Sequence, residues 1–194
     1  PKKFTAVDAP DLLKRLLDAR FSWAPQGNEA HESWLKESVK QLGNYFAAEV
    51  EAAATKHHLD ADLVQAVCMV ESSGSTIAYR FEPAFWERYL RTNPLYSKAN
   101  PRRVSASYGL MQVMFPTAVG HGMPIETPPE LLYLAEFGLE WGCEILKRCY
   151  EWAEQDTLAA LAAYNGGRSA DNRPGRVPKR NQAYVDKVMK ALAQ

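Results

Sequence analysis

The chain has 194 residues and carries 23 Lys plus Arg against 23 Asp plus Glu, so its formal net charge is zero. Its composition, 46% hydrophobic and 24% charged, is that of a folded globular domain and excludes a disordered tail. The charge balance argues against a nucleic-acid binder, because phosphate recognition needs a basic excess. No stretch approaches the roughly 20 apolar residues of a membrane span, and the first residues do not resemble a signal peptide.

Apolar residues recur at helical spacing along almost the whole chain, and no stretch alternates convincingly as a strand. The spacing predicts an all-α domain with long loops, whose Pro-rich loops cover 92–106 and 115–129. Asp60 is expected to cap the helix at 61–72, and Thr157 is expected to cap the helix at 158–164. Gly138 and Gly142 are expected to let another helix approach the helix at 131–153 closely. The predicted helices are residues 8–20, 29–58 (with a possible break at Gly43), 61–72, 85–91, 131–153, 158–164 and 181–192.

Three cysteines are too few for a disulfide framework, and we expect buried free thiols. The pair His57-His58 has no partner at helical i+4 spacing, so no metal site is expected. Long loops in a compact domain usually carry function, which directs attention to the residues around them.

Glu71 is the first residue with a chemical signature. It follows an apolar helical run, and its neighbours one turn back are Val67 and Cys68. Burial and the negative end of the helix dipole both raise the pKa of a carboxyl group there. A carboxylic acid that stays protonated near neutral pH is what a glycosidase needs as its general acid.

Three further motifs follow Glu71-Ser72 in order. They are Gly109-Leu110-Met111-Gln112, Ala163-Tyr164-Asn165 and the Tyr184-Val185 helix. The ordered series resembles the soluble lytic transglycosylase family, whose fold is similar to goose-type lysozyme, over about residues 59–189. The resemblance implies an all-α, lysozyme-like catalytic domain at residues 56–194, preceded by a small helical segment at residues 1–55.

The resemblance also implies roles for single residues. Glu71 matches the family's single catalytic acid, Gln112 and Met114 match residues that line the sugar cleft, and Tyr184 matches the tyrosine that faces the acid. Tyr164 and Asn165 match the pair beside the scissile bond, although Asn165 before Gly166 is also typical of a helix C-cap. Amide and phenol groups suit sugar hydroxyls, and Met and Tyr faces suit pyranose rings.

The chain departs from the family pattern in the long connection between Glu71 and Gly109, where residues 78–101 form an aromatic-rich insertion. Its aromatic side chains either pack the insertion onto the domain or add a wall to the cleft, with Trp86 or Tyr79 stacking on sugar. The insertion also holds Glu82, a possible second carboxylate. A basic loop at residues 168–180 is either solvated or contacts anionic peptide stems.

The resemblance implies a peptidoglycan lytic transglycosylase that cuts the bond between N-acetylmuramic acid and N-acetylglucosamine and forms a 1,6-anhydro end. It implies no metal and no organic cofactor. We expect a monomer, encoded by a bacterium or a phage, that acts on the cell wall in the periplasm or outside the cell. A muramidase of the same fold is the first alternative and would use a second carboxylate, Glu82 or Glu87, to hold a water. A non-catalytic wall-binding or virion module is the second, and the presence of Glu71 with the tyrosines argues against it.

Overall fold

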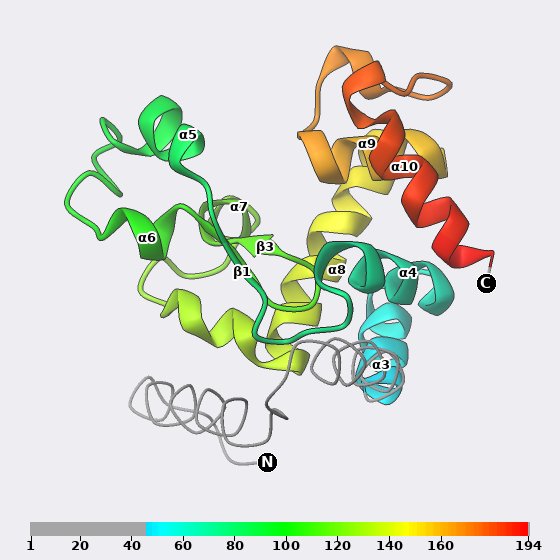
Figure 1. Ribbon diagram of the computed structural model, residues 1–194, viewed down its shortest axis with the longest axis horizontal. Coiled ribbons are helices and arrows are strands. Elements are labelled where there is room, and N and C mark those ends of the chain that lie inside the picture. Colours follow the sequence, from blue (N-terminus) through cyan, green and yellow to red (C-terminus); the bar gives the residue numbers. More distant parts are fainter. Residues whose placement is uncertain (1–45, 194) are drawn as a thin grey trace, which may run out of the picture.

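The computed structural model describes residues 46–193, which are mostly helical (Figure 1). The longer helices are α3 (Ala47–His57), α4 (Ala61–Ser72), α8 (Ala135–Trp152), α9 (Thr157–Gly166) and α10 (Lys179–Leu192). The short ones are α5 (Pro83–Phe85), α6 (Pro101–Val104), α7 (Phe115–Gly120), the π-helical η1 (Trp86–Leu90) and the 3₁₀ turns η2 (Pro129–Tyr133) and η3 (Ala170–Asn172). None of the helices in this part of the chain has the length and hydrophobicity to cross a membrane.

The predicted helices at residues 8–20 and in the first part of 29–58 lie outside the described residues. The division of the chain at residue 55 therefore stays a prediction. Of the predicted helix at 29–58, the structure describes its last part, which is α3.

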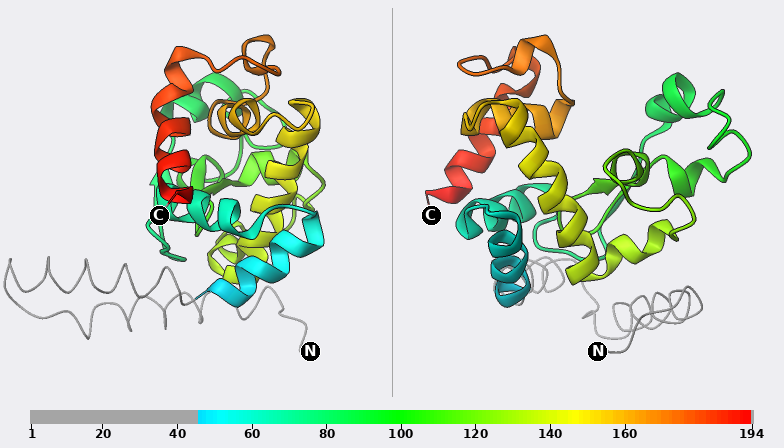
Figure 2. Two further views of the ribbon diagram at one scale, coloured as in Figure 1. Left: turned by 90° about the vertical axis from the view of Figure 1, so that its right-hand side faces the viewer. Right: turned by 180° about the vertical axis from the view of Figure 1, so that it is seen from behind.

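Helix α8 runs between two groups of elements (Figures 1 and 2). On one side lie α3, α4, α9 and α10, and on the other the small sheet with α5, α6 and α7. The side chains of Leu139, Cys143 and Leu146 on α8 are completely buried, so the helix supplies the centre of the core to both groups.

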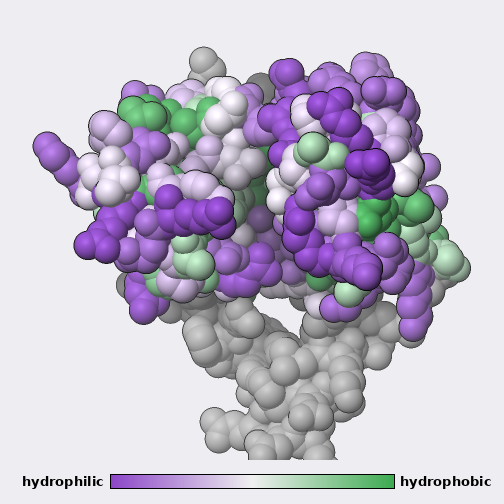
Figure 3. Space-filling model, turned by 90° about the horizontal axis from the view of Figure 1, so that it is seen from above, coloured by the Kyte–Doolittle hydropathy of each residue, from purple (hydrophilic) through white to green (hydrophobic). Residues whose placement is uncertain are grey.

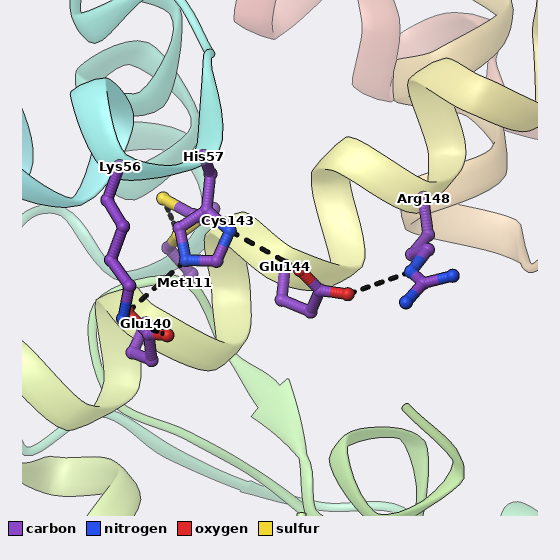
Figure 4. A network of polar contacts seen from close by, with 7 residues as sticks. All are labelled: Lys56, His57, Met111, Glu140, Cys143, Glu144 and Arg148. Carbon is purple, nitrogen blue, oxygen red and sulfur yellow. Dashed lines mark hydrogen bonds and ion pairs between the residues drawn. The ribbon is translucent and has the colours of Figure 1, made fainter. Parts of the chain in front are cut away.

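A buried histidine joins α3 to α8. The imidazole of His57 lies between two carboxylates of α8, with Nε2 3.2 Å from Glu140 and Nδ1 3.4 Å from Glu144 (Figure 4). Lys56 Nζ adds an ion pair to Glu140 at 2.6 Å. These contacts explain His57 as a packing residue, and no group of three metal-ligating side chains occurs within residues 46–193.

Helix α4 forms as its local sequence predicts. The Asp60 carboxylate accepts a hydrogen bond from the Leu63 backbone N–H at 2.9 Å and so caps the first turn. Leu63, Val64 and Val67 are buried. The helix ends where Ser73 adopts a left-handed conformation with φ 54°, which leaves Glu71 in the last turn.

Other predicted boundaries are wrong. Helix α9 is capped by Asp156, not Thr157, because the Asp156 carboxylate reaches the Ala159 backbone N–H at 3.0 Å. The predicted helix 131–153 is two elements, since Leu134 is extended between η2 and α8. The last helix begins at Lys179, and the predicted loops at 92–106 and 115–129 contain α6 and α7.

The structure also contains a small antiparallel sheet that periodicity does not reveal. Its strands are β1 (Tyr79–Phe81), β2 (Ala106–Tyr108) and β3 (Val113–Met114), in the order β1-β2-β3. Tyr79 pairs with Tyr108, and Ser107 pairs with Met114. Strands of two or three residues are too short to show an alternating pattern. The sheet places β1 of the insertion beside the motif at residues 109–112.

Candidate functional site

A cleft of about 680 Å³ lies between the two groups of elements. Seen from above, the surface is hollowed between two masses of mainly hydrophilic side chains (Figure 3). The cleft is lined by Glu71, Arg80, Phe85, Tyr89, Ser107, Gln112, Val113, Met114, Thr117, His121, Ile145, Cys149, Ala163, Tyr164, Asn165, Gly166, Gly167 and Arg168. The lining residues come from α4, the three strands, the insertion, α7, α8 and α9, so elements far apart in sequence form one site.

Glu71 reaches this cleft from the last turn of α4. Burial raises the pKa of its carboxyl group, and a smaller opposing effect comes from the Tyr184 hydroxyl and the Arg80 guanidinium, which both favour the charged form. The Tyr184 hydroxyl is buried and has no other hydrogen-bond partner of normal geometry within the described residues. Glu71 thus keeps its proton to a higher pH than a solvated glutamate. After proton transfer, the Tyr184 hydroxyl and the Arg80 guanidinium stabilise the carboxylate.

Ser72, next to the acid, ties α4 to the opposite wall. Its hydroxyl lies 2.9 Å from the Cys68 carbonyl oxygen and 2.8 Å from that of Leu110, and donates to either. The second bond spans 38 positions of sequence. Ser72 therefore sets the distance between Glu71 and the residues of the 109–112 motif.

The Gly109-Leu110-Met111-Gln112 motif is the tight connection between β2 and β3. Gly109 has φ 70°, and a Cβ there would lie closer than 3.0 Å to the Leu132 carbonyl oxygen. The Gln112 amide nitrogen donates to the carbonyl oxygens of Ala78 at 3.2 Å and Gly109 at 3.1 Å. The Met111 carbonyl oxygen accepts from the Tyr164 hydroxyl at 2.8 Å. These contacts make the connection a rigid wall of the cleft.

Gly138 and Gly142 were predicted to let a neighbouring helix approach α8. Instead, Gly142 lies against this wall and Gly138 lies against η2. A Cβ at Gly142 would collide with the buried Met111 side chain, and one at Gly138 with the Leu132 carbonyl oxygen. That prediction is wrong in its partner but right in its reason, because close approach to α8 does require glycine at both positions.

The family comparison agrees with this geometry. The model of the transglycosylase SLT domain family matches residues 49–186. The chain belongs to this family. Among solved structures, an X-ray structure of an inactive glutamate-to-glutamine mutant of the lytic transglycosylase Slt from Pseudomonas aeruginosa matches 75% of this chain with a TM-score of 0.53 and 18% identity.

That likeness shows the fold alone, and the match covers 23% of the neighbour's length. No curated protein matches the chain.

The transglycosylase cleft contains five of the predicted site residues. Glu71, Gln112, Met114, Tyr164 and Asn165 all line it. Tyr184 lies behind Glu71 and is not part of the lining. Tyr164 directs its hydroxyl to backbone, so its contribution to the cleft surface is its ring.

Asn165 does not end α9. The helix continues through Gly166, and its C-cap is Gly167 with φ 79°. The Asn165 side-chain oxygen accepts a hydrogen bond from the Asn181 amide at 2.8 Å, which joins α9 to α10.

The two candidates from the insertion lie outside the cleft lining. The Glu82 carboxylate forms an ion pair with Arg80, whose own side chain lines the cleft. Trp86 is half-buried and packs against the hydrophobic core. Phe85 and Tyr89, on either side of it, line the cleft, so the insertion both packs on the domain and adds a wall.

Arg80 and His121 are cleft residues that the sequence analysis did not assign to the cleft, and Arg168 lines it from the basic loop that the sequence analysis left as either solvated or a contact for anionic peptide stems. Arg80 had no signal of its own, because its position depends on the pairing of β1 with β2. Arg168 belongs to the basic loop, and its place directly after Gly166-Gly167 was the available clue.

The cysteines do not offer an alternative nucleophile. Cys68, Cys143 and Cys149 are buried and free, as predicted. Burial raises the pKa of Cys149, the one that lines the cleft, to about 12. A thiol with that pKa is not ionised at neutral pH.

Proposed function

We propose that this chain is a peptidoglycan lytic transglycosylase that cuts between N-acetylmuramic acid and N-acetylglucosamine and leaves a 1,6-anhydromuramyl end. The observation that carries the proposal is that Glu71, with its raised pKa, is the single carboxyl group among the cleft-lining residues that the structure describes. A non-hydrolytic cleavage needs one acid, which then acts as base.

In the first step Glu71 gives its proton to the glycosidic oxygen as the bond from that oxygen to C1 of the muramyl residue breaks. The carbonyl oxygen of the substrate's own N-acetyl group supports C1 from the other face. In the second step the C6 hydroxyl oxygen bonds to C1, and its proton passes to the Glu71 carboxylate. No water is consumed, and the enzyme returns to its starting state.

The other predicted residues serve binding and support. Met114 and the ring of Tyr164 offer apolar surface to the sugar rings, and Asn165 offers an amide. The Gln112 amide nitrogen donates to the carbonyl oxygens of Ala78 and Gly109, and its amide oxygen is left to accept a hydrogen bond from the substrate. Tyr184 supports the Glu71 carboxylate after proton transfer.

No observation favours the hydrolytic alternative. An inverting muramidase holds its water on a second carboxylate roughly 6.5–9.5 Å from the acid, across the cleft. Glu82 is paired with Arg80 and does not line the cleft. A pure binding module would have no use for a buried acid in the cleft.

Digestion of purified peptidoglycan tests the proposal. The wild-type chain is expected to release muropeptides with anhydro ends, one water lighter than hydrolytic products. Glu71→Gln should lose at least about 10²-fold in rate, because the amide cannot deliver a proton. Glu82→Gln, the matched control, should keep much of the activity.

Reducing ends in the wild-type digest together with an inactive Glu82→Gln variant would make the protein a muramidase. Binding of peptidoglycan without any cleavage would make it a wall-binding module. Action on the wall in the periplasm or outside the cell, and a monomeric state, are further parts of the proposal.

A further inference from the structure

The cleft contains a cation that the proposed reaction does not use. Among the described residues, its lining holds one carboxyl group, Glu71, one imidazole, His121, and two guanidinium groups, Arg80 and Arg168. Glu71 is the acid, and Arg80 is neutralised by Glu82. Arg168 has no ion-pair partner within residues 46–193.

The backbone around Arg168 is held in place. Gly166 lies against Asn181, where a Cβ would come closer than 3.0 Å to the Asn181 amide nitrogen. Asn181 is buried and donates to Asn165 at 2.8 Å. Gly167 has φ 79° and ψ 156°, a conformation that is essentially restricted to glycine. These contacts fix the path of the backbone at the end of α9, and so fix the position of the Arg168 backbone.

The Arg168 side chain faces a second wall of the cleft, built by α7 and α8. Burial lowers the pKa of the His121 imidazole, and the nearby charges of Arg168 and Arg148 lower it further. Glu144 has a weaker, opposing effect. Arg168 is also close enough to Cys149 to favour the charged form of that thiol. Arg148 itself is paired with Glu144 (Figure 4). His121 is therefore a neutral hydrogen-bonding group beside an uncompensated guanidinium.

The groups that act on the Glu71 carboxyl are the neutral Tyr184 hydroxyl, through a hydrogen bond, and the Arg80 guanidinium, through its charge. Arg168 is not among the groups that shift the Glu71 pKa. With no ion-pair partner in the described part of the chain, the Arg168 charge is available to a ligand.

The glycan backbone itself offers nothing to pair with Arg168. Its groups are hydroxyls, acetamido groups and, on each muramyl residue, a lactyl carboxyl that is consumed in the amide to the peptide. The anions of intact peptidoglycan are the free carboxylates of the peptide stems. A guanidinium recognises a carboxylate with two parallel hydrogen bonds, and a neutral imidazole beside it adds a third.

We infer that the wall formed by Arg168 and His121 binds a free carboxylate of the peptide stem, so that the enzyme prefers glycan whose stems carry that charge. The inference rests on the proposed function and adds a specificity determinant to it. Arg168 is exposed and lies at the rim, so its contribution is modest, about five-fold in kcat/KM.

The test compares two soluble glycan tetrasaccharides that bear the same peptide stems, one with free carboxylates and one with these converted to primary amides. The wild-type chain should cleave the free-acid substrate about five-fold more efficiently at low salt, and the preference should shrink at about 0.5 M salt. Arg168→Gln should abolish the preference by slowing the free-acid substrate alone, and Arg168→Lys should restore part of it. Arg176→Gln is the matched control, an exposed arginine of the same loop outside the cleft lining, and should keep the preference.

Equal cleavage of both substrates by the wild type, or an equal loss on both with Arg168→Gln, overturns the inference and leaves the proposed function standing. An Arg176→Gln variant that loses the preference as well would assign it to the net charge of the loop and would also overturn it. Cleavage of neither substrate overturns the proposed function, and this inference falls with it.

Discussion

Replacement of Gly109 by alanine tests whether the 109–112 connection is a rigid wall. Gly109 has φ 70°, which costs an alanine about 1–2 kcal/mol. The new methyl group would also lie closer than 3.0 Å to the Leu132 carbonyl oxygen, a backbone atom that cannot rotate away. Overpacking of this kind typically costs another 1–3 kcal/mol. The free energy of unfolding of Gly109→Ala should therefore fall by about 2–5 kcal/mol.

Gly175→Ala is the matched control. Gly175 has φ 73°, almost the same as Gly109, but a Cβ there would meet nothing within 4 Å. The control therefore carries the backbone cost alone, and the difference between the two variants isolates the contact with Leu132. Urea denaturation at one pH measures both. For a chain of this size each kcal/mol also lowers Tm by about 2–4 °C.

The variant should also lose activity under conditions where it remains folded. A shift of the turn displaces Gln112 and the Met111 carbonyl oxygen that holds Tyr164. If Gly109→Ala is no less stable than Gly175→Ala, the motif is not held against η2 and the reasoning fails.

Three other outcomes follow from the charges and packing of the site. The folded chain binds the Glu71 proton more tightly than the unfolded chain, so the free energy of unfolding of the wild type should fall as pH rises from about 4.5 through the raised pKa. Glu71→Gln should not show this fall. If the urea midpoints of the two proteins change in parallel between pH 4, 6 and 8, the prediction is wrong. Arg80→Gln removes a charge that favours the Glu71 carboxylate and should move the alkaline limb of activity to higher pH. Glu82→Gln leaves Arg80 uncompensated and should move it to lower pH, so shifts in the same direction would refute the pairing. Trp86→Ala should cost less than the ~3–5 kcal/mol of a fully buried aromatic and leave the glycan affinity of the folded protein unchanged, and weaker binding of long strands at unchanged Tm would show that Trp86 contacts sugar.

The sequence by itself determined the elements whose causes are local. Asp60, the apolar residues one and two turns beyond it and Ser73-Gly74 lie within fifteen positions of one another. They were enough to predict helix α4 and to place Glu71 at its end. The sequence also indicated that Gly138 and Gly142 allow a close approach, although the atoms that make this approach, the Leu132 carbonyl oxygen and the Met111 side chain, were not predictable.

Only the tertiary structure decided which distant residues meet. Arg80 faces Glu71 because a three-residue strand pairs with β2, and Arg168 enters the cleft because Asn181 of α10 holds the end of α9. His57 is a packing residue because α3 lies across two carboxylates of α8. Capping and hydrophobic periodicity involve residues within a few positions of one another, so they can be recognised in the sequence. The contacts above depend on how whole elements pack, and no local sequence pattern shows which distant residue will be the partner.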